Sequence, residues 1–83
     1  MLKASNMSHI EVVAKFTASG GLAPEYFKDG NREYKINSVN LVRSVRRGAR
    51  RIIVFNVSDE GGEHILIFDT ENLKWQLETN HGS

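Results

Sequence analysis

The stretch LVRSVRRGARRIIVF, residues 41–55, decides the fold, because it predicts a hairpin around its single glycine. Gly48 divides a segment that contains Leu41 and Val45 from the apolar run IIVFNV at residues 52–57. Glycine readily adopts the positive φ that tight turns need, so two antiparallel strands joined at this position are the simplest interpretation. The rest of the chain is expected to add strands on both sides of this hairpin.

A second hairpin is predicted upstream, around the Asp29-Gly30 pair in EYFKDGNREYKI. An Asp-Gly pair between β-favouring residues is one of the strongest short-range hairpin signals. We expect a short strand over residues 25–28, entered at Pro24, and a return strand that starts at Arg32. One helical turn within LAPEYFKD, residues 22–29, is the alternative that the sequence leaves open.

The return strand of this hairpin changes phase along its length. Tyr34 and Ile36 share one side of the alternation, whereas Val39 and Leu41 share the other. The phase therefore slips near residues 37–38. A bulge or sharp bend at that point would restore a single buried face, as it does in small barrels and rolls.

Both ends of the chain also predict strands. In HIEVVAKFTA, every second residue from Ile10 to Phe16 is apolar, which is typical of a half-buried strand. Near the C-terminus, an acidic turn SDEGGE precedes HILIF and LKWQLE, two strands joined by the turn DTEN, in which Asn72 suits the left-handed region. The core-facing residues of the last strand are expected to be Leu73, Trp75 and Leu77.

These segments predict an all-β protein of five to six antiparallel strands, arranged as a meander that forms a small, partly open barrel or a highly curved sheet. With 83 residues, the chain is expected to be a single domain over residues 9–78. Residues 1–8 are interpreted as a disordered leader and residues 79–83 as a frayed tail. The sequence lacks a long apolar run and a secretory signal, so we expect a cytoplasmic protein without a membrane partner.

The charge is distributed unevenly along the chain. Residues 1–42 carry five basic and four acidic groups, residues 43–51 carry five arginines, and residues 52–83 carry six acidic groups and one lysine. The whole chain has a formal net charge of only +1. The molecule is therefore a candidate electrostatic dipole if the fold keeps these segments apart, and the charges cancel if it brings them together.

The arginine cluster is the candidate binding site. Guanidinium groups bind phosphates in a bidentate manner and stack on bases, so a hairpin that carries several of them could lie along a nucleic-acid backbone. The candidate residues are Arg43, Arg46, Arg47, Arg50 and Arg51. Two other interpretations remain open: a solvated tip that discourages edge pairing, and a cluster neutralised by the acidic residues 59–71.

Aromatic residues beside the arginines would strengthen a nucleic-acid interpretation, because bases stack on them. The phases of Tyr34 and Trp75 place both in the core instead. One of Tyr26 and Phe27 must point outward if their segment is a strand.

The sequence offers no recognisable catalytic or metal-binding motif. It contains no cysteine, no HExxH pair, no phosphate-cradling glycine loop and no nucleophile elbow. His9, His64 and His81 lie near the ends of predicted segments or in the tail. We therefore expect no enzyme activity, no metal site and no cofactor.

A family resemblance runs over residues 10–78. The pattern P-x-x-F…R-x-Y-x-I-x-x-V, formed by Pro24, Phe27, Arg32, Tyr34, Ile36 and Val39 and followed by LKWQL, resembles a group of short uncharacterised bacterial all-β domains. Related modules are appended to Y-family-like DNA polymerase proteins. The resemblance implies a small all-β fold and a nucleic-acid setting, and it carries no catalytic residues. The arginine-rich hairpin of this chain departs from the polymerase-linked members, which also have more tryptophans.

The leading functional hypothesis is a binding module that holds nucleic acid weakly and without sequence preference through the basic hairpin. The alternative is a protein-interaction or assembly module, which pairs with a protein partner or with itself as a dimer through strand edges or opposite charges.

Overall fold

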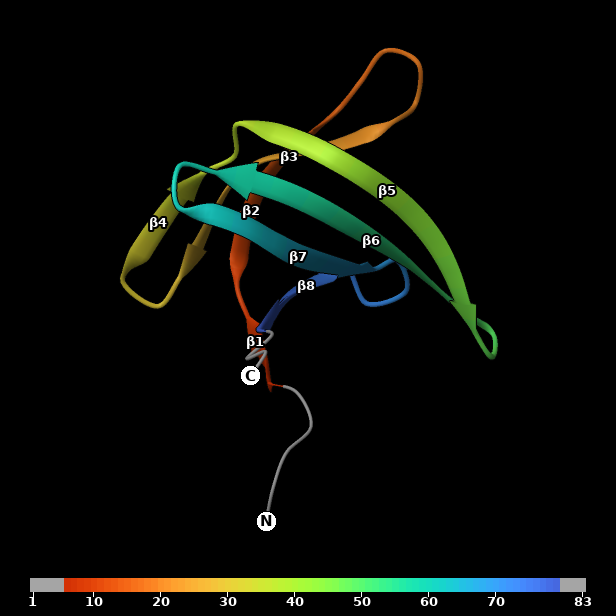
Figure 1. Cartoon of the computed structure of the whole chain (residues 1–83). Helices are drawn as coiled ribbons and strands as arrows, with labels where there is room; N and C mark the ends of the chain where they lie inside the picture. The colour runs from red at the N-terminus through yellow and green to blue at the C-terminus, as the bar shows by residue number, and fades with distance from the viewer. Residues whose placement is uncertain (1–5, 80–83) are drawn as a thin grey trace.

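Two antiparallel sheets hold the core between them in residues 6–79, the part of the chain that this computed structural model describes (Figure 1). The strands are β1 (Asn6–His9), β2 (Glu11–Phe16), β3 (Leu22–Asp29), β4 (Arg32–Lys35), β5 (Ser38–Arg47), β6 (Arg50–Asp59), β7 (Gly62–Asp69) and β8 (Lys74–Thr79). The larger sheet has the order β1-β8-β7-β6-β5, and the smaller sheet has the order β2-β3-β4. Residues 6–79 contain no helix long and apolar enough to cross a membrane.

The chain passes between the sheets at two short junctions. Ile10 separates β1 in the larger sheet from β2 in the smaller one, and its backbone N–H donates to the Trp75 carbonyl at 3.4 Å. At the second junction, Ile36 N–H donates to Glu25 O at 3.0 Å and Asn37 N–H donates to Ser58 O at 2.8 Å. Two neighbouring residues thus bind different sheets, and the chain turns sharply there.

Both sheets contribute to one hydrophobic core. Its buried members are Phe27, Phe55, Val57, Leu66 and Leu77. Phe27 comes from β3 of the smaller sheet and stacks on the ring of Tyr34, with 4.6 Å between ring centroids. The other four come from the larger sheet, where Trp75 packs against Phe55 and Phe68 at 5.5 and 4.7 Å. Trp75 and Tyr34 therefore pack against the core, as the sequence predicts.

The two predicted hairpins are present, and glycine makes both turns possible. Asp29 pairs with Arg32, and Arg47 pairs with Arg50, so each loop has two residues. Gly30 and Gly48 occupy the first loop position with φ of +63°. Glycine with positive φ at this position is the requirement of a type II′ turn, whose twist matches that of the flanking strands. The helical turn considered for residues 22–29 is wrong, because that segment is β3.

The all-β prediction is confirmed, and the open, curved arrangement of the sheets agrees with it. The predicted number of strands is wrong, because two expected strands are each divided between the sheets. The first divides at Ile10 into β1 and β2, and the long return strand divides into β4 and β5 at residues 36–37. The phase slip in the sequence therefore marks a change of sheet, which alternation alone does not distinguish from a bulge.

The predicted ends of the domain also need correction. Residues 6–8, expected in a disordered leader, belong to β1, which pairs with β8 from Asn6–Thr79 to His9–Gln76. Thr79, expected in the frayed tail, ends β8. The remainder of both predicted segments, residues 1–5 and 80–83, lies outside the described residues.

The apolar side of β5 is not buried as predicted. A bulge at Asn40 places Val39 and Leu41 on opposite faces of the sheet, and both side chains remain exposed, at 39% and 50%. The reason is the position of β5 at the edge of the larger sheet, where it pairs only with β6.

Candidate nucleic-acid interface

The arginine cluster lies at the far end of the β5–β6 hairpin. Pairing between β6 and β7 stops at Ile52 and Asp69, so the hairpin extends further than its neighbours (Figure 1). The carbonyl of Arg51 accepts hydrogen bonds from Thr70 N–H at 3.2 Å and Thr70 Oγ1 at 2.8 Å. These contacts anchor the base of the projecting tip, which consists of residues 46–51.

The arginines divide between the two faces of the larger sheet. Cross-strand partners share a face, and alternate residues change face. We call the face that carries Phe55 and Leu66 the inner face, because it meets the core, and the opposite one the outer face. The inner-face arginines are Arg46 and Arg51, and the outer-face arginines are Arg43, Arg47 and Arg50.

Only one of the five arginines forms an ion pair with the described acidic residues. Arg50 Nη1 lies 3.1 Å from Asp69 Oδ2, and its Nε lies 3.7 Å from Glu71 Oε1. Asp69 and Glu71 are thus the described carboxylates of residues 59–71 that contact the arginine cluster, and both contact the same guanidinium, that of Arg50. All five arginines are exposed. Arg43, Arg46, Arg47 and Arg51 have no carboxylate of the described residues within 4.0 Å.

Like charges stand directly opposite each other in the tip. Arg46 pairs with Arg51, and Arg47 pairs with Arg50. Directly opposed like charges destabilise an antiparallel ladder. The repulsion within Arg46–Arg51 is not offset by any ion pair with the described carboxylates, whereas Arg50 of the second pair contacts Asp69 and Glu71.

No aromatic platform accompanies the arginines in the described larger sheet, because Phe55, Phe68 and Trp75 pack in or against the core. Two aromatic residues of β3 were candidates for a stacking platform. Phe27 is buried, and Tyr26 points outward but belongs to the smaller sheet, away from the arginines. The pKa of Tyr26 is raised above 10.0, first by burial and then by the hydrogen bond and charge of Glu33. A carboxylate neighbour is unfavourable for a residue that must approach nucleic acid.

One exposed aromatic residue was missed by the sequence interpretation. Phe16 ends β2 with 77% of its surface exposed, although the alternation placed it with Ile10 and Val12. The bulge in this pair lies on β3, where Glu25 has no partner between Val13–Tyr26 and Ala14–Pro24, so the alternation within β2 is unchanged and Ala14 is still half-buried. Phe16 is exposed at the end of the strand.

A polar cluster at the β6–β7 turn surrounds Asp59. Asp59 Oδ1 accepts from Gly61 N–H at 2.7 Å and Gly62 N–H at 3.0 Å, and His64 Nε2 lies 3.2 Å away without hydrogen-bond alignment. Burial, the largest single influence, raises the pKa of Asp59, but the glycine amides and the charge of His64 together lower it below 3.8. The His64 ring packs edge-on against Phe27 and Tyr34 at 5.3 and 5.2 Å. The cluster therefore closes a turn and supports the core.

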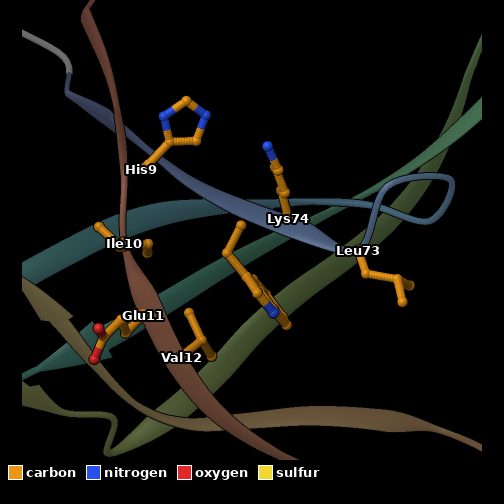
Figure 2. A pocket seen from close by; sticks show the side chains of 7 residues that line it. His9, Ile10, Glu11, Val12, Leu73 and Lys74 are labelled. Atoms are coloured by element: carbon orange, nitrogen blue, oxygen red, sulfur yellow. The ribbon is translucent and has the colours of Figure 1, made fainter.

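A cleft of about 480 Å³ opens where β1 and β2 pass β8 (Figure 2). Its walls include Ile10, Val12 and Trp75, with His9 and Lys74 on one side (Figure 2). Leu73 also lines the cleft (Figure 2). Within residues 6–79, no three metal-ligating side chains come together, at this cleft or elsewhere.

Comparison of the chain with protein-family models, with curated proteins and with solved structures finds no significant match. The resemblance to the short bacterial all-β domains therefore stays a prediction.

Proposed function

We propose that the β5–β6 hairpin binds the phosphate backbone of nucleic acids without reading their sequence. The observation that carries this proposal is the pair of opposed arginine rungs, Arg46–Arg51 and Arg47–Arg50, at a projecting tip. Among the described residues, carboxylates neutralise only Arg50 of these four. A bound polyanion would offset the repulsion between Arg46 and Arg51 and the charge of Arg47, which the ion pairs of Arg50 leave uncompensated. Phosphate contacts by arginine fix position but carry no information about base sequence.

The lack of an aromatic platform on the hairpin limits the type of complex. Proteins that prefer single strands gain about 1–3 kcal/mol for each base that stacks on an aromatic side chain. The described residues of β5 and β6 offer no such stacking outside the core, so duplexes are expected to bind at least as well as single strands of equal length. Three or four phosphate contacts on a duplex give a slope of log affinity against log salt of roughly −3.

The test compares two variants with equal changes in net charge. Arg46→Glu/Arg47→Glu alters the tip, and Arg32→Glu/Lys35→Glu alters exposed residues of β4 in the smaller sheet. Fluorescence anisotropy with a labelled duplex at low salt measures the affinity. We expect the tip variant to bind at least about tenfold more weakly than the wild type, with a shallower salt slope, because two phosphate contacts are lost.

The β4 variant serves as the control for net charge and is expected to keep most of the affinity. Equal losses in the two variants would indicate a nonspecific effect of charge and would contradict a site at the tip. Undetectable binding of the wild-type protein at low salt would reject the proposal altogether.

A further inference from the structure

Strand β5 forms the longest free strand edge in the part of the chain that the structure describes (Figure 1). It is ten residues long and pairs only with β6. The other edge strands, β1, β2 and β4, have four, six and four residues. Proteins commonly keep exposed edge strands short, because the unpaired N–H and C=O groups of an edge bind other strands. The length of β5 therefore makes this edge a candidate docking surface.

The pairing with β6 fixes which backbone groups of β5 face the free edge. In an antiparallel ladder, hydrogen-bonded pairs alternate with pairs whose N–H and C=O groups point away from each other. The carbonyl of Arg51, the partner of Arg46, accepts hydrogen bonds from Thr70 and not from β5, so this pair is of the second type. By alternation, Ser44 and Val42 belong to pairs of the same type. The N–H and C=O groups of Val42, Ser44 and Arg46 therefore point away from β6, toward the free edge.

The bulge at Asn40 marks the place where the regular part of this edge begins. Ser38 Oγ donates to Asn40 Oδ1 at 2.9 Å, and Asn40 Nδ2 donates to Ser58 Oγ at 2.8 Å, so side chains hold the bulge in place. A bulge disrupts the regular ladder around it. Residues 41–47 are therefore the segment of β5 that a partner strand can follow.

The side chains of this segment are basic at one end and apolar at the other. Arg43, Arg46 and Arg47 have no carboxylate of the described residues within 4.0 Å, and β5 itself contains no acidic residue. Leu41 and Val42 are about half exposed, at 50% and 51%. The complement of this segment is a strand with acidic side chains toward the tip and apolar side chains toward the bulge.

We propose that the free edge of β5 binds an extended acidic segment of another protein, which pairs with residues 41–47 as an additional antiparallel strand. In this mode of recognition, main-chain hydrogen bonds supply affinity and alternate side chains supply specificity. The main-chain bonds go to Val42, Ser44 and Arg46. Acidic side chains of the partner meet Arg43 and Arg47 on the outer face.

The inner face receives the remaining side chains of the partner. There an acidic side chain meets Arg46, and an apolar one covers Val42. A second apolar side chain covers Leu41 on the outer face. Complementary charges fix the register of such a pairing, because a shift by one residue would move each acidic side chain to the opposite face.

The arginines that attract an acidic strand also disfavour a second copy of β5 as the partner. Two such strands would combine the three arginines of each copy in one ladder that has no acidic side chain. Like charges on paired strands destabilise the pairing. Repulsion of the wrong partner is a common source of specificity, so the charges on this edge select a strand of opposite sign.

This inference does not rest on the proposed nucleic-acid binding. A partner strand needs the unpaired backbone of β5, whereas phosphates need only the guanidinium groups. The substitution Ser44→Pro separates the two, because it removes an N–H that faces the free edge and leaves all the arginines in place. Proline is tolerated at edge positions where the missing N–H would face solvent.

The experiment uses a fluorescent acetylated peptide, Glu-Glu-Val-Thr-Glu-Val-Val, whose residues lie opposite Arg47 to Leu41 in that order. Anisotropy at low salt, with protein up to about 1 mM, reaches the weak affinities of small transient interfaces. We expect N-methylation of the threonine to weaken binding at least about tenfold, because its N–H faces the Ser44 carbonyl and the methyl group would clash there. The matched control is N-methylation of the third residue, whose N–H points away from β5, and it should leave binding unchanged.

Two further measurements test the charge and the protein side of the contact. A peptide with Gln in place of each Glu should bind at least about tenfold more weakly, because its contacts with three arginines lose their charge. Ser44→Pro should weaken peptide binding at least about tenfold and leave duplex binding unchanged, with Trp75 fluorescence to verify folding.

The comparison of the peptides does not depend on the folding of any variant. Equal binding of the two N-methylated peptides would overturn the inference, because it would indicate charge attraction without strand pairing. Equal binding of the Gln peptide would overturn the acidic character of the partner. Undetectable binding of the acidic peptide at about 1 mM protein would reject the docking surface, whatever the protein does with nucleic acid.

Discussion

Among residues 6–79, Leu73 is the one non-glycine residue with a positive φ, at +61°. This region is sterically unfavourable for a residue with a Cβ atom and a long side chain. The turn holds it there through hydrogen bonds at both ends: Leu73 N–H donates to Asp69 O at 2.9 Å, and Lys74 N–H donates to Asn72 Oδ1 at 3.1 Å. The sequence predicted Asn72 for this conformation, and the structure places it one residue later.

Replacing Leu73 with asparagine should therefore stabilise the protein. Asparagine tolerates the left-handed region, and 69% of the leucine surface is already exposed, so little apolar burial is lost. We expect the free energy of unfolding to rise by about 0.5–1 kcal/mol, measured by urea denaturation. Leu73→Ala keeps the backbone conflict and is the control; equal stabilisation by alanine would show that the backbone conformation is not the cause.

At the level of elements, the β6–β7 hairpin depends on a charged turn. The Asp59 carboxylate binds two backbone N–H groups of the turn and faces His64, and these contacts favour its ionised form. Its pKa in the folded protein is below the ordinary 3.8, so ionised Asp59 stabilises the fold above that pH. This contribution disappears as the pH falls through the folded pKa, because protonation then occurs in both folded and unfolded states.

The substitution Asp59→Asn tests this linkage, because it keeps an oxygen acceptor for the two amides and removes the charge. We expect the variant to be less stable than the wild type at neutral pH, and the difference to shrink as the pH falls below 3.8. Urea denaturation at several pH values measures this difference in the free energy of unfolding. The control is Glu60→Gln. Glu60 lies in the same turn but forms no ion pair with the described residues, so the free energy of unfolding of this variant should differ little from that of the wild type. A stability difference that does not depend on pH would contradict a role for the Asp59 charge.

At the level of the whole molecule, Phe27 joins the two sheets into one structure. It belongs to the smaller sheet, and its side chain is fully buried against residues of the larger one. The neighbouring residue Tyr26 faces the opposite side and is only half-buried. The two sheets are therefore expected to unfold together rather than as separate units.

Phe27→Ala should destabilise the entire protein by about 3–5 kcal/mol, a large part of the stability of a small domain. Trp75 lies in the other sheet, so its fluorescence reports whether the loss reaches that sheet. We expect the urea midpoint of the Trp75 signal to fall strongly in this variant and much less in Tyr26→Ala. An unchanged Trp75 transition in Phe27→Ala would mean that the sheets unfold independently.

The sequence by itself determined the local features of this protein. Alternation located most of the strands, and Gly30 and Gly48 predicted two turns correctly, because a strand face and a positive φ depend on residues close in the chain. The sequence also placed the arginines at the end of a hairpin.

Only the tertiary structure decided which sheet each strand joins and which side chains meet. Alternation does not distinguish a bulge from the change of sheet at residues 36–37, and it does not reveal that β5 is an edge strand with an exposed apolar side. The pairing of Arg50 with Asp69, while four arginines stay free of described carboxylates, depends on where β7 ends beside β6. The physical reason is that neutralisation requires contact within a few ångströms between residues far apart in the chain, which strand pairing and core packing bring together.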